Sequence, residues 1–207
     1  MILSKPDIEA ELEAGRLLID PPPTSSQIGP ISINLKLGRS FTVLKELPDY
    51  VPALRVGEAL IRAKEMWETK EDRDRFRLNP GDFVLGHTQE RVTMPGHLMG
   101  LLEGRSSWAR TGIIMHLTAP KIDPGFQGTI TLEMLNVGRA PVELVPEDDE
   151  PVQLMLVMLT RALDGSSVYG SSQRDIFQGQ DKPLPRRAEK GQPPDGSQGR
   201  AKSRLAG

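Results

Sequence analysis

Short apolar runs separated by Pro/Gly turns constrain the fold of this chain more than any other feature. Proline and glycine supply the backbone angles of tight turns, and many short strands between such turns are typical of an all-β barrel or sandwich. The sequence therefore predicts a mainly β fold with short helices. The turns punctuate the chain from Leu78 to residue 160, at Asn79-Pro-Gly, Met94-Pro-Gly, Asp123-Pro-Gly, Val137-Gly and Val145-Pro.

Two segments near the N-terminus have clear periodicity. We expect a helix over residues 4–19, in which Ser4 caps the first turn and an apolar stripe is formed by Ile8, Leu12 and Leu18. A half-buried strand is expected next, because apolar and polar residues alternate there. Its apolar positions are Ile31, Ile33, Leu35 and Leu37.

Two later segments are read differently. Residues 46–76 are charged and carry apolar residues at roughly helical spacing, so we interpret them as a helical insertion. These residues are Ala59, Leu60, Ala63 and Trp67. Residues 152–160 are continuously apolar, which predicts a buried strand.

Composition and charge exclude several classes of protein. The formal net charge of −2 provides no general attraction to nucleic acid or to an anionic membrane. No apolar run is long enough to span a bilayer and the N-terminus lacks the layout of a signal peptide, so we expect a cytoplasmic protein with no membrane or nucleic-acid partner. With no cysteine and three histidines, a protein-held zinc or other metal centre is not expected, and the zinc-dependent base deaminases are excluded.

An Arg/Ser-rich run at residues 104–110 is the first candidate site. Arginine gives permanently charged, bidentate donors, and serine hydroxyls fill further acceptor positions, as a polyphosphate requires. An ordinary surface turn is the alternative. Within the run, Trp108 is also explained by a core or interface position. The candidates are Arg105, Ser106, Ser107, Trp108, Ala109 and Arg110.

The second candidate site is a strand that follows the Asp123-Pro-Gly turn. Simple alternation places Ile130, Leu132 and Met134 on one face, and Thr129, Thr131 and Glu133 on the other. A solvated strand face is the alternative for Glu133. Asp123 is equally explained as the first residue of a β-turn, and His116 as a core histidine.

The C-terminal part of the chain is expected to hold a flap and a tail. Residues 1–165 form the main domain, and aromatics and glutamines separated by glycine at 166–183 suit a flap that closes on a ligand, with a plain linker as the alternative. Residues 184–207 are polar and rich in Pro and Gly, which predicts a disordered tail.

Together, these segments resemble the deoxycytidine triphosphate (dCTP) deaminases of the dUTPase-like superfamily. The motifs occur in the family's order, from Met1-Ile-Leu-Ser through EGRSSWAR and HLTAPKIDPGFQGTITLEMLN to YG…FQGQ, and the similarity ends near residue 183. The resemblance implies a distorted β-barrel or jelly-roll-like subunit (β-clip) and a homotrimer with its sites between subunits. It also implies dCTP as substrate, with Mg²⁺ held through the triphosphate, and deamination to dUTP and ammonia without zinc, in pyrimidine deoxynucleotide metabolism.

The resemblance also assigns roles to residues. Glu133 matches the glutamate that activates water, and Ser106, Arg110 and the Ala119 carbonyl match the groups that position this water and the 4-amino group. Positions matching the substrate contacts are Arg105, Ser107, Trp108, Ala109, Asp123, Thr131, Leu132, Gln153, Tyr169 and Gln180.

Three positions depart from the family's pattern. Asn34 stands where an acidic residue is usual, Ile176 where the flap carries a lysine, and Pro120 where histidine or glycine is common. Two alternatives to simple deamination follow. One is a bifunctional enzyme that continues to dUMP and pyrophosphate, and the other is a non-catalytic nucleotide-binding homologue.

Overall fold

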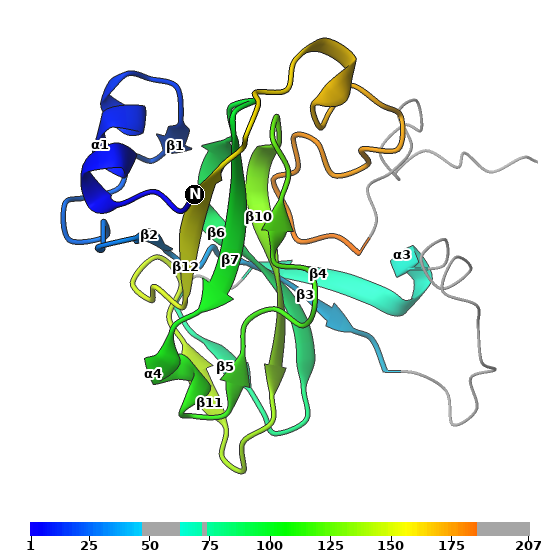
Figure 1. Ribbon diagram of the computed structural model, residues 1–207. Helices are drawn as coiled ribbons and strands as arrows, with labels where there is room; N and C mark the ends of the chain where they lie inside the picture. The colour runs from blue at the N-terminus through cyan, green and yellow to red at the C-terminus, as the bar shows by residue number, and fades with distance from the viewer. Residues whose placement is uncertain (47–62, 72–73, 186–207) are drawn as a thin grey trace, which may run out of the picture.

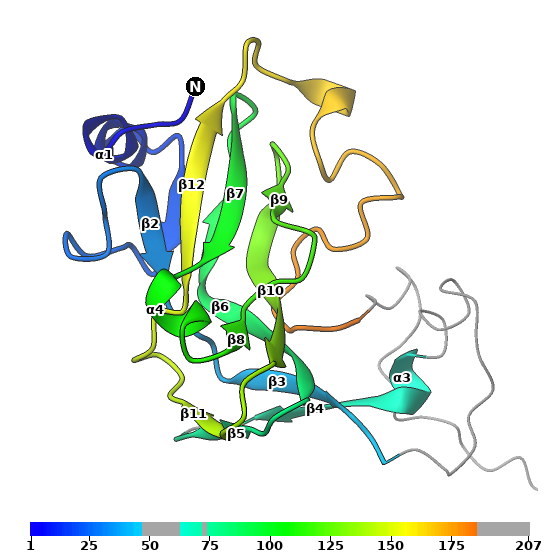
Figure 2. The same cartoon turned by 60° about the horizontal axis from the view of Figure 1, so that its bottom comes forward.

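Two antiparallel sheets form the body of the protein (Figures 1 and 2). The computed structural model describes residues 1–46, 63–71 and 74–185. One sheet has the strand order β4-β3-β6-β10-β8, with β1 also paired to β6, and the other has the order β2-β12-β7-β9. A small ribbon pairs β11 with β5. The prediction of a mainly β fold is confirmed.

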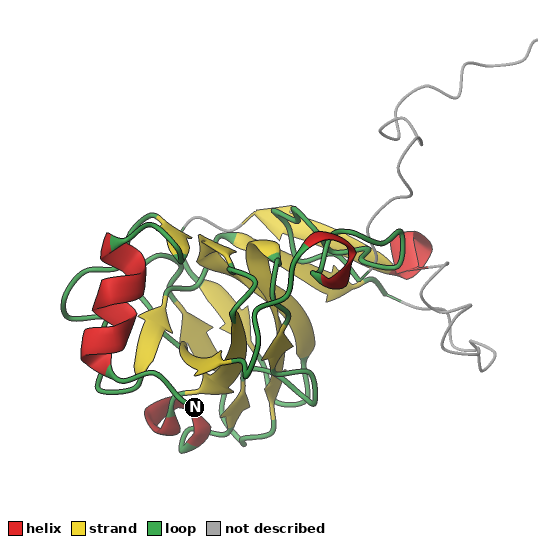
Figure 3. Cartoon of the chain, turned by 45° about the horizontal axis from the view of Figure 1, so that its top comes forward, coloured by secondary structure: helices red, strands yellow, loops and turns green. Residues whose placement is uncertain are grey.

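The helices are short and lie at the periphery of the strands (Figure 3). They are α1 (Lys5–Glu13), α3 (Ala63–Met66), α4 (Ser106–Ala109) and the 3-10 turn η1 (Gly165–Ser167). The strands are β1 (Leu18–Asp20), β2 (Ser32–Leu35), β3 (Ser40–Leu44), β4 (Trp67–Glu71), β5 (Phe76–Leu78), β6 (Phe83–Thr93), β7 (Leu98–Gly104), β8 (Ile113–Ile114), β9 (Lys121–Ile122), β10 (Gln127–Asn136), β11 (Val142–Leu144) and β12 (Val152–Met158).

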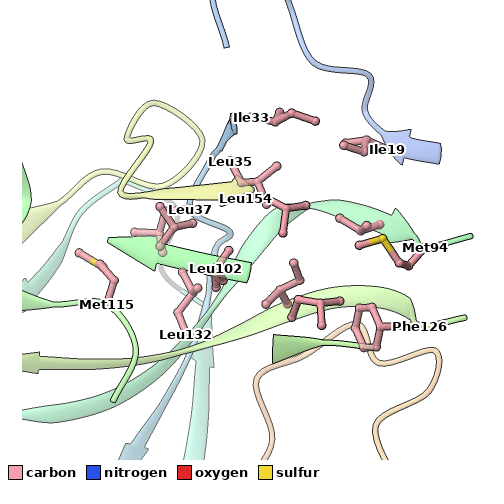
Figure 4. Close-up of a cluster of buried hydrophobic side chains, with 14 of the residues drawn as sticks. Ile19, Ile33, Leu35, Leu37, Met94, Leu102, Met115, Phe126, Leu132 and Leu154 are labelled. Carbon is pink, nitrogen blue, oxygen red and sulfur yellow. The ribbon is translucent and has the colours of Figure 1, made fainter. Parts of the chain in front are cut away.

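Inward-facing side chains from both sheets meet in one core (Figure 4). Ile33 and Leu154 come from one sheet, and Leu132 comes from the other; each is fully buried. Burying a side chain of this kind stabilises the fold by roughly 1.5–3 kcal/mol. The core therefore fixes which face of β10 points inward, and with it the direction of the opposite face.

The N-terminal helix is shorter than the sequence predicts. It ends at Glu13, because Gly15 has φ +64° and the N–H groups of Gly15 and Arg16 bond the carbonyls of Leu12 and Glu11. This is the Schellman arrangement, which needs a left-handed residue after the helix. Leu18 was wrongly placed on the apolar stripe; it lies in β1 and is half exposed.

The helical interpretation of residues 46–76 is wrong in the part that is described. Among the described residues of this segment, one helical turn, α3, is present, and Trp67 begins β4 instead. Strand β4 pairs with β3 along its whole length, and the hydroxyls of Thr42 and Thr69 are 2.8 Å apart. Pairing with a distant strand outweighs the local helical spacing. Ala59 and Leu60, which supported the helix, lie outside the described residues.

Two smaller strand predictions need correction. Ile31 was placed on a buried face, but it precedes β2 and is 48% exposed. The segment 152–160 forms β12 only as far as Met158, and the strand alternates between fully and partly buried residues. Only one face of β12 therefore belongs to the core.

Candidate functional site

Strand β10 carries the central residues of the site. Its Ile130, Leu132 and Met134 are buried, whereas Thr131 and Glu133 are only partly buried on the other face. The predicted alternation is confirmed from Ile130 to Met134. Thr129, predicted on the face of Glu133, is instead buried, next to a register shift between Thr129 and Thr131. Strand β6 pairs with β10 and places Leu85 opposite Glu133, whereas β8 pairs with β10 only at Leu135 and Asn136.

A pocket of about 490 Å³ opens over this face of β10. Its volume lies within the range of small-molecule sites, and its walls combine apolar and polar side chains as such sites do. The pocket brings together several residues predicted from the sequence, namely Ala119, Asp123, Thr131, Glu133, Tyr169 and Gln180. Its apolar wall includes Trp67, Phe83, Leu85, Ile122, Phe126, Ile130 and Phe177.

The carboxylate of Glu133 has few protein partners. The backbone N–H of Leu117 donates to Glu133 Oε2 over 3.5 Å, a long hydrogen bond. Burial raises the pKa of Glu133 above its ordinary value, and the Leu117 N–H and the nearby His116 only partly oppose this. A carboxylate with a raised pKa is a stronger base, as proton abstraction from water requires.

Replacing Glu133 by glutamine is expected to raise the melting temperature at neutral pH. The stability associated with the protonated carboxyl is complete below its unfolded pKa near 4.5 and is lost as pH rises through the raised folded pKa. The uncharged glutamine avoids this loss. Thermal unfolding of both proteins from about pH 4 to pH 8 should show a difference that grows with pH. Equal melting temperatures throughout would contradict the burial of an ionised Glu133.

The Asp123-Pro-Gly turn forms the rim of the pocket. The N–H of Phe126 bonds the carbonyl of Asp123 over 3.1 Å, so Asp123 is the first residue of a β-turn, as its sequence pattern predicts. Gly125 follows with φ +88°, a conformation that this turn requires of glycine. Asp123 also borders the pocket, where Lys121 Nζ lies 2.7 Å from its Oδ1.

The C-terminal segment lies over the same pocket. Gln180 accepts the N–H of Thr129 over 3.0 Å through its carbonyl, and donates from Nε2 to the Thr129 carbonyl over 2.8 Å. The approach is close because residue 128 is glycine; a Cβ there would lie 2.7 Å from the Gln180 carbonyl oxygen. Tyr169 packs against Phe126, and its hydroxyl accepts the N–H of Phe177 over 3.2 Å.

The boundary of the C-terminal segment lies beyond the predicted flap. Leu184 and Pro185, which the sequence assigns to the tail, border the pocket. Lys182 pairs with Glu71 of β4 over 3.0 Å and thereby ties the segment to the first sheet. The rest of the predicted tail lies outside the described residues.

The Arg/Ser-rich run lies apart from this pocket within one chain. Helix α4 and the C-terminal segment are on different sides of the sheets in both views (Figures 1 and 2). Ser106, Ser107, Ala109 and Arg110 are exposed, whereas Trp108 packs against the core. None of these residues borders the pocket.

Three more residues predicted from the sequence, Gln153, Arg105 and Leu132, also lie outside the pocket. Gln153 lies on the outward face of β12, paired with Asn34 of β2 and Glu103 of β7. Arg105, which precedes α4, donates from Nη1 to the Glu150 carbonyl over 3.0 Å. Leu132, expected to line the base pocket, is fully buried in the core and does not border the cavity.

No group of three or more His, Cys, Asp or Glu side chains is placed to hold a metal ion within the described residues. No helix in the described part of the chain is long and apolar enough to cross a membrane.

Comparisons with known proteins identify the family. A family model described as "dCTP deaminase-like" matches residues 2–156. The chain is 42% identical over 185 residues to "dCTP deaminase, dUMP-forming" of Halobacterium salinarum, a match covering 88% of this chain and 92% of that one. The chain belongs to the dCTP deaminase-like family.

Two further matches extend this picture. The "dCTP deaminase" of Tolumonas auensis is 37% identical over 84% of this chain and 88% of its own length. The 2'-deoxycytidine 5'-triphosphate deaminase of Agrobacterium tumefaciens has a similar structure, with a TM-score of 0.58 and 20% identity over 80% of this chain and 50% of that one. At that identity, the structural match supports the shared fold alone.

Several pocket residues were not predicted from the sequence. Trp67 was missed because its segment was interpreted as helical, and it meets Phe83 edge to face at 5.8 Å. Lys121 could have been found, because a residue two positions before Asp123 shares its face of an extended segment. Phe177 belongs to the flap motif, but its place in the apolar wall depends on long-range contacts that the sequence does not show.

Proposed function

We propose that this protein deaminates dCTP to dUTP and ammonia, with Glu133 as the general base. The observation that carries the proposal is a partly buried glutamate with a raised pKa on the wall of a nucleotide-sized pocket, in a chain of this family.

Each step of the reaction uses a group with the required chemistry. Glu133 takes a proton from water, and the resulting hydroxide attacks C4 of the cytosine ring. The protonated carboxyl then delivers its proton to ring N3. Transfer of the remaining hydroxyl proton to the 4-amino group, again through Glu133, allows ammonia to leave. The Ala119 carbonyl, Ser106 and Arg110 orient the water and the amino group.

The proposed site is shared between subunits of a homotrimer. Glu133 lines the pocket, whereas α4 with Ser106 and Arg110 lies on another side of the same chain. A second copy can bring its α4 to the pocket, which gives one site at each interface of a closed ring.

Partly exposed apolar side chains support such an assembly. Met155 pairs with Leu101, and Val157 with Met99, on the outward face of β12 and β7, where each is only partly buried. Contiguous apolar surface of this kind is typical of an interaction face.

The substrate is proposed to be the magnesium complex of dCTP. Mg²⁺ prefers phosphate oxygens, water and one or two carboxylates to an all-protein cage. Arg105 and Ser107 supply charged and hydroxyl donors for the triphosphate. Asp123, Thr131, Tyr169 and Gln180 then contact the nucleoside within the pocket.

A second candidate function is deamination followed by cleavage of dUTP to dUMP and pyrophosphate. Relatives named as dUMP-forming, such as that of Halobacterium salinarum, favour it. Asp123 borders the pocket beside Lys121, and in this second reaction it would activate the water that cleaves dUTP.

Incubation with dCTP and Mg²⁺, followed by ion-exchange separation of the nucleotides, tests the proposal. Formation of dUTP supports deamination alone, and formation of dUMP supports the bifunctional reaction. An unchanged dCTP pool, with added dUTP also untouched, would contradict both and favour a non-catalytic nucleotide-binding protein.

Truncation after Gly165 is expected to raise the KM for dCTP at least about tenfold or to remove activity, because the lost segment closes the pocket. The matched control is truncation after Pro185, which keeps every described flap residue and should change KM by less than about twofold. Steady-state kinetics of both proteins make the comparison. Unchanged kinetics after the longer deletion would mean that residues 166–185 do not act as a flap.

A further inference from the structure

We propose that Glu150 is a positioning residue that holds Arg105 ready for the triphosphate, and that Asn34 holds Glu150 in turn. The inference deepens the proposed function and rests on it, because Arg105 is assigned to the phosphates there. Glu150 lies in the turn between β11 and β12 and does not border the pocket that contains Glu133.

The turn that contains Glu150 holds Arg105 through hydrogen bonds. Arg105 Nη1 donates to the Glu150 carbonyl over 3.0 Å and to Glu150 Oε2 over 3.4 Å, and the Arg105 backbone N–H donates to the Pro151 carbonyl over 3.0 Å. Only Nη1 is used by the protein within the described residues. The Nε and Nη2 groups of the 37% exposed side chain therefore remain available to an anionic ligand.

Asn34 in turn supports Glu150. The Asn34 Nδ2 group donates to Glu150 Oε2 over 3.2 Å, so this oxygen is shared between the amide and Arg105. An aspartate at position 34 would place two carboxylates at hydrogen-bonding distance, where like charges repel. Asn34 is thus the residue type that suits a carboxylate at position 150.

The turn itself is rigid. The N–H of Leu37 bonds the Asp149 carbonyl over 2.9 Å, and the N–H of Glu147 bonds the Leu37 carbonyl over 2.7 Å. The Asp149 carboxylate accepts the N–H of Val145 over 2.6 Å. A fixed turn can orient a guanidinium, whereas a loose one cannot.

A structural role alone does not account for this arrangement. The ion pair is partly exposed, with Arg105 at 37% and Glu150 at 23%, and pairs of this kind add little to stability. Glu150 also reduces the local positive charge, which by itself weakens anion binding. The benefit is orientation: a long side chain that is already ordered loses less entropy when it binds.

A double-mutant cycle between Glu150→Gln and Arg105→Ala tests the proposal. Glu150→Gln is expected to raise the KM for the magnesium complex of dCTP about fivefold and to leave kcat within about twofold. In the Arg105→Ala background, the same change should have no further effect on KM. A KM that stays unchanged or falls in the single variant, or that rises equally in both backgrounds, would overturn the inference.

Reversal of the Asn34 contact provides a rescue. Asn34→Asp alone should raise KM further than Glu150→Gln does, because two facing carboxylates repel. Adding Glu150→Gln should then lower KM to within about twofold of the Glu150→Gln single variant, because the amide and the carboxylate have exchanged places. The matched control is Glu143→Gln, which removes a surface carboxylate paired with Arg75 and should leave both constants unchanged.

Failure of the proposed function is recognised separately. If the wild-type protein does not turn over dCTP, calorimetry with inorganic tripolyphosphate and Mg²⁺ replaces KM in the same cycle. Weaker binding in Glu150→Gln that disappears in the Arg105→Ala background would then support the inference without deamination. Equal binding by the wild type and Glu150→Gln would overturn it. If the wild type turns over dCTP but Glu150→Gln leaves KM unchanged, Glu150 does not position Arg105, and the proposal of deamination is unaffected.

Discussion

Glu133→Gln is expected to lower the kcat for dCTP deamination by about 10³-fold or more while leaving dCTP binding within about threefold of wild type. Glutamine has the same shape and fills the same partly buried position on β10, but it cannot accept a proton from water. Without that transfer, no hydroxide forms to attack C4. The measurement is steady-state kinetics together with calorimetric binding of dCTP.

Two controls make the Glu133→Gln result specific. Glu143→Gln is the same chemical change on the surface and should leave kcat unchanged. In the wild type, kcat/KM should fall as pH drops through the raised pKa of Glu133, since the base must be unprotonated. A variant that loses binding to the same degree as turnover would show that Glu133 holds the substrate and would remove its role as base.

Local patterns predicted the direction of side chains but not their environment. The alternation of β10 is set by residues two positions apart, so the face of Glu133 could be predicted from the sequence alone. The burial of Glu133 could not be predicted in this way. The pocket wall around it includes Tyr169, Phe177 and Gln180, which are distant from Glu133 in the sequence.

Long-range pairing also explains the errors. Trp67 has helical spacing with its neighbours, and only the pairing of β4 with β3 places it in a strand. Similarly, the contact of Arg105 with Glu150 joins residues 45 positions apart. The motifs that resemble a known family predicted which residues matter, whereas their separation into a pocket and a distant helix α4 required the structure.

Because Glu133 and helix α4 lie apart within one chain, we expect two inactive variants to recover activity when their subunits are mixed. Glu133→Gln and Arg110→Ala are each expected to be inactive, because one lacks the base and the other lacks the cation beside it. If a site takes Glu133 from one subunit and Arg110 from its neighbour, a mixed trimer contains sites with both residues intact. In closed three-fold rings that contain both kinds of subunit, one interface of the three has the required orientation, so about a third of wild-type sites should be restored.

The control for this mixing experiment uses two changes within the same segment. Ser106→Ala and Arg110→Ala both lie on or next to α4 of one subunit. Whichever subunit provides α4 then lacks one of the two side chains, so their mixture should remain as inactive as its components. Co-expression of differently tagged subunits, with purification through both tags, yields the mixed trimers for assay with dCTP. Recovery in the first mixture and none in the control would establish a shared site. No recovery in either would mean that Glu133 and Arg110 act within one chain, and that α4 moves to the pocket of its own subunit.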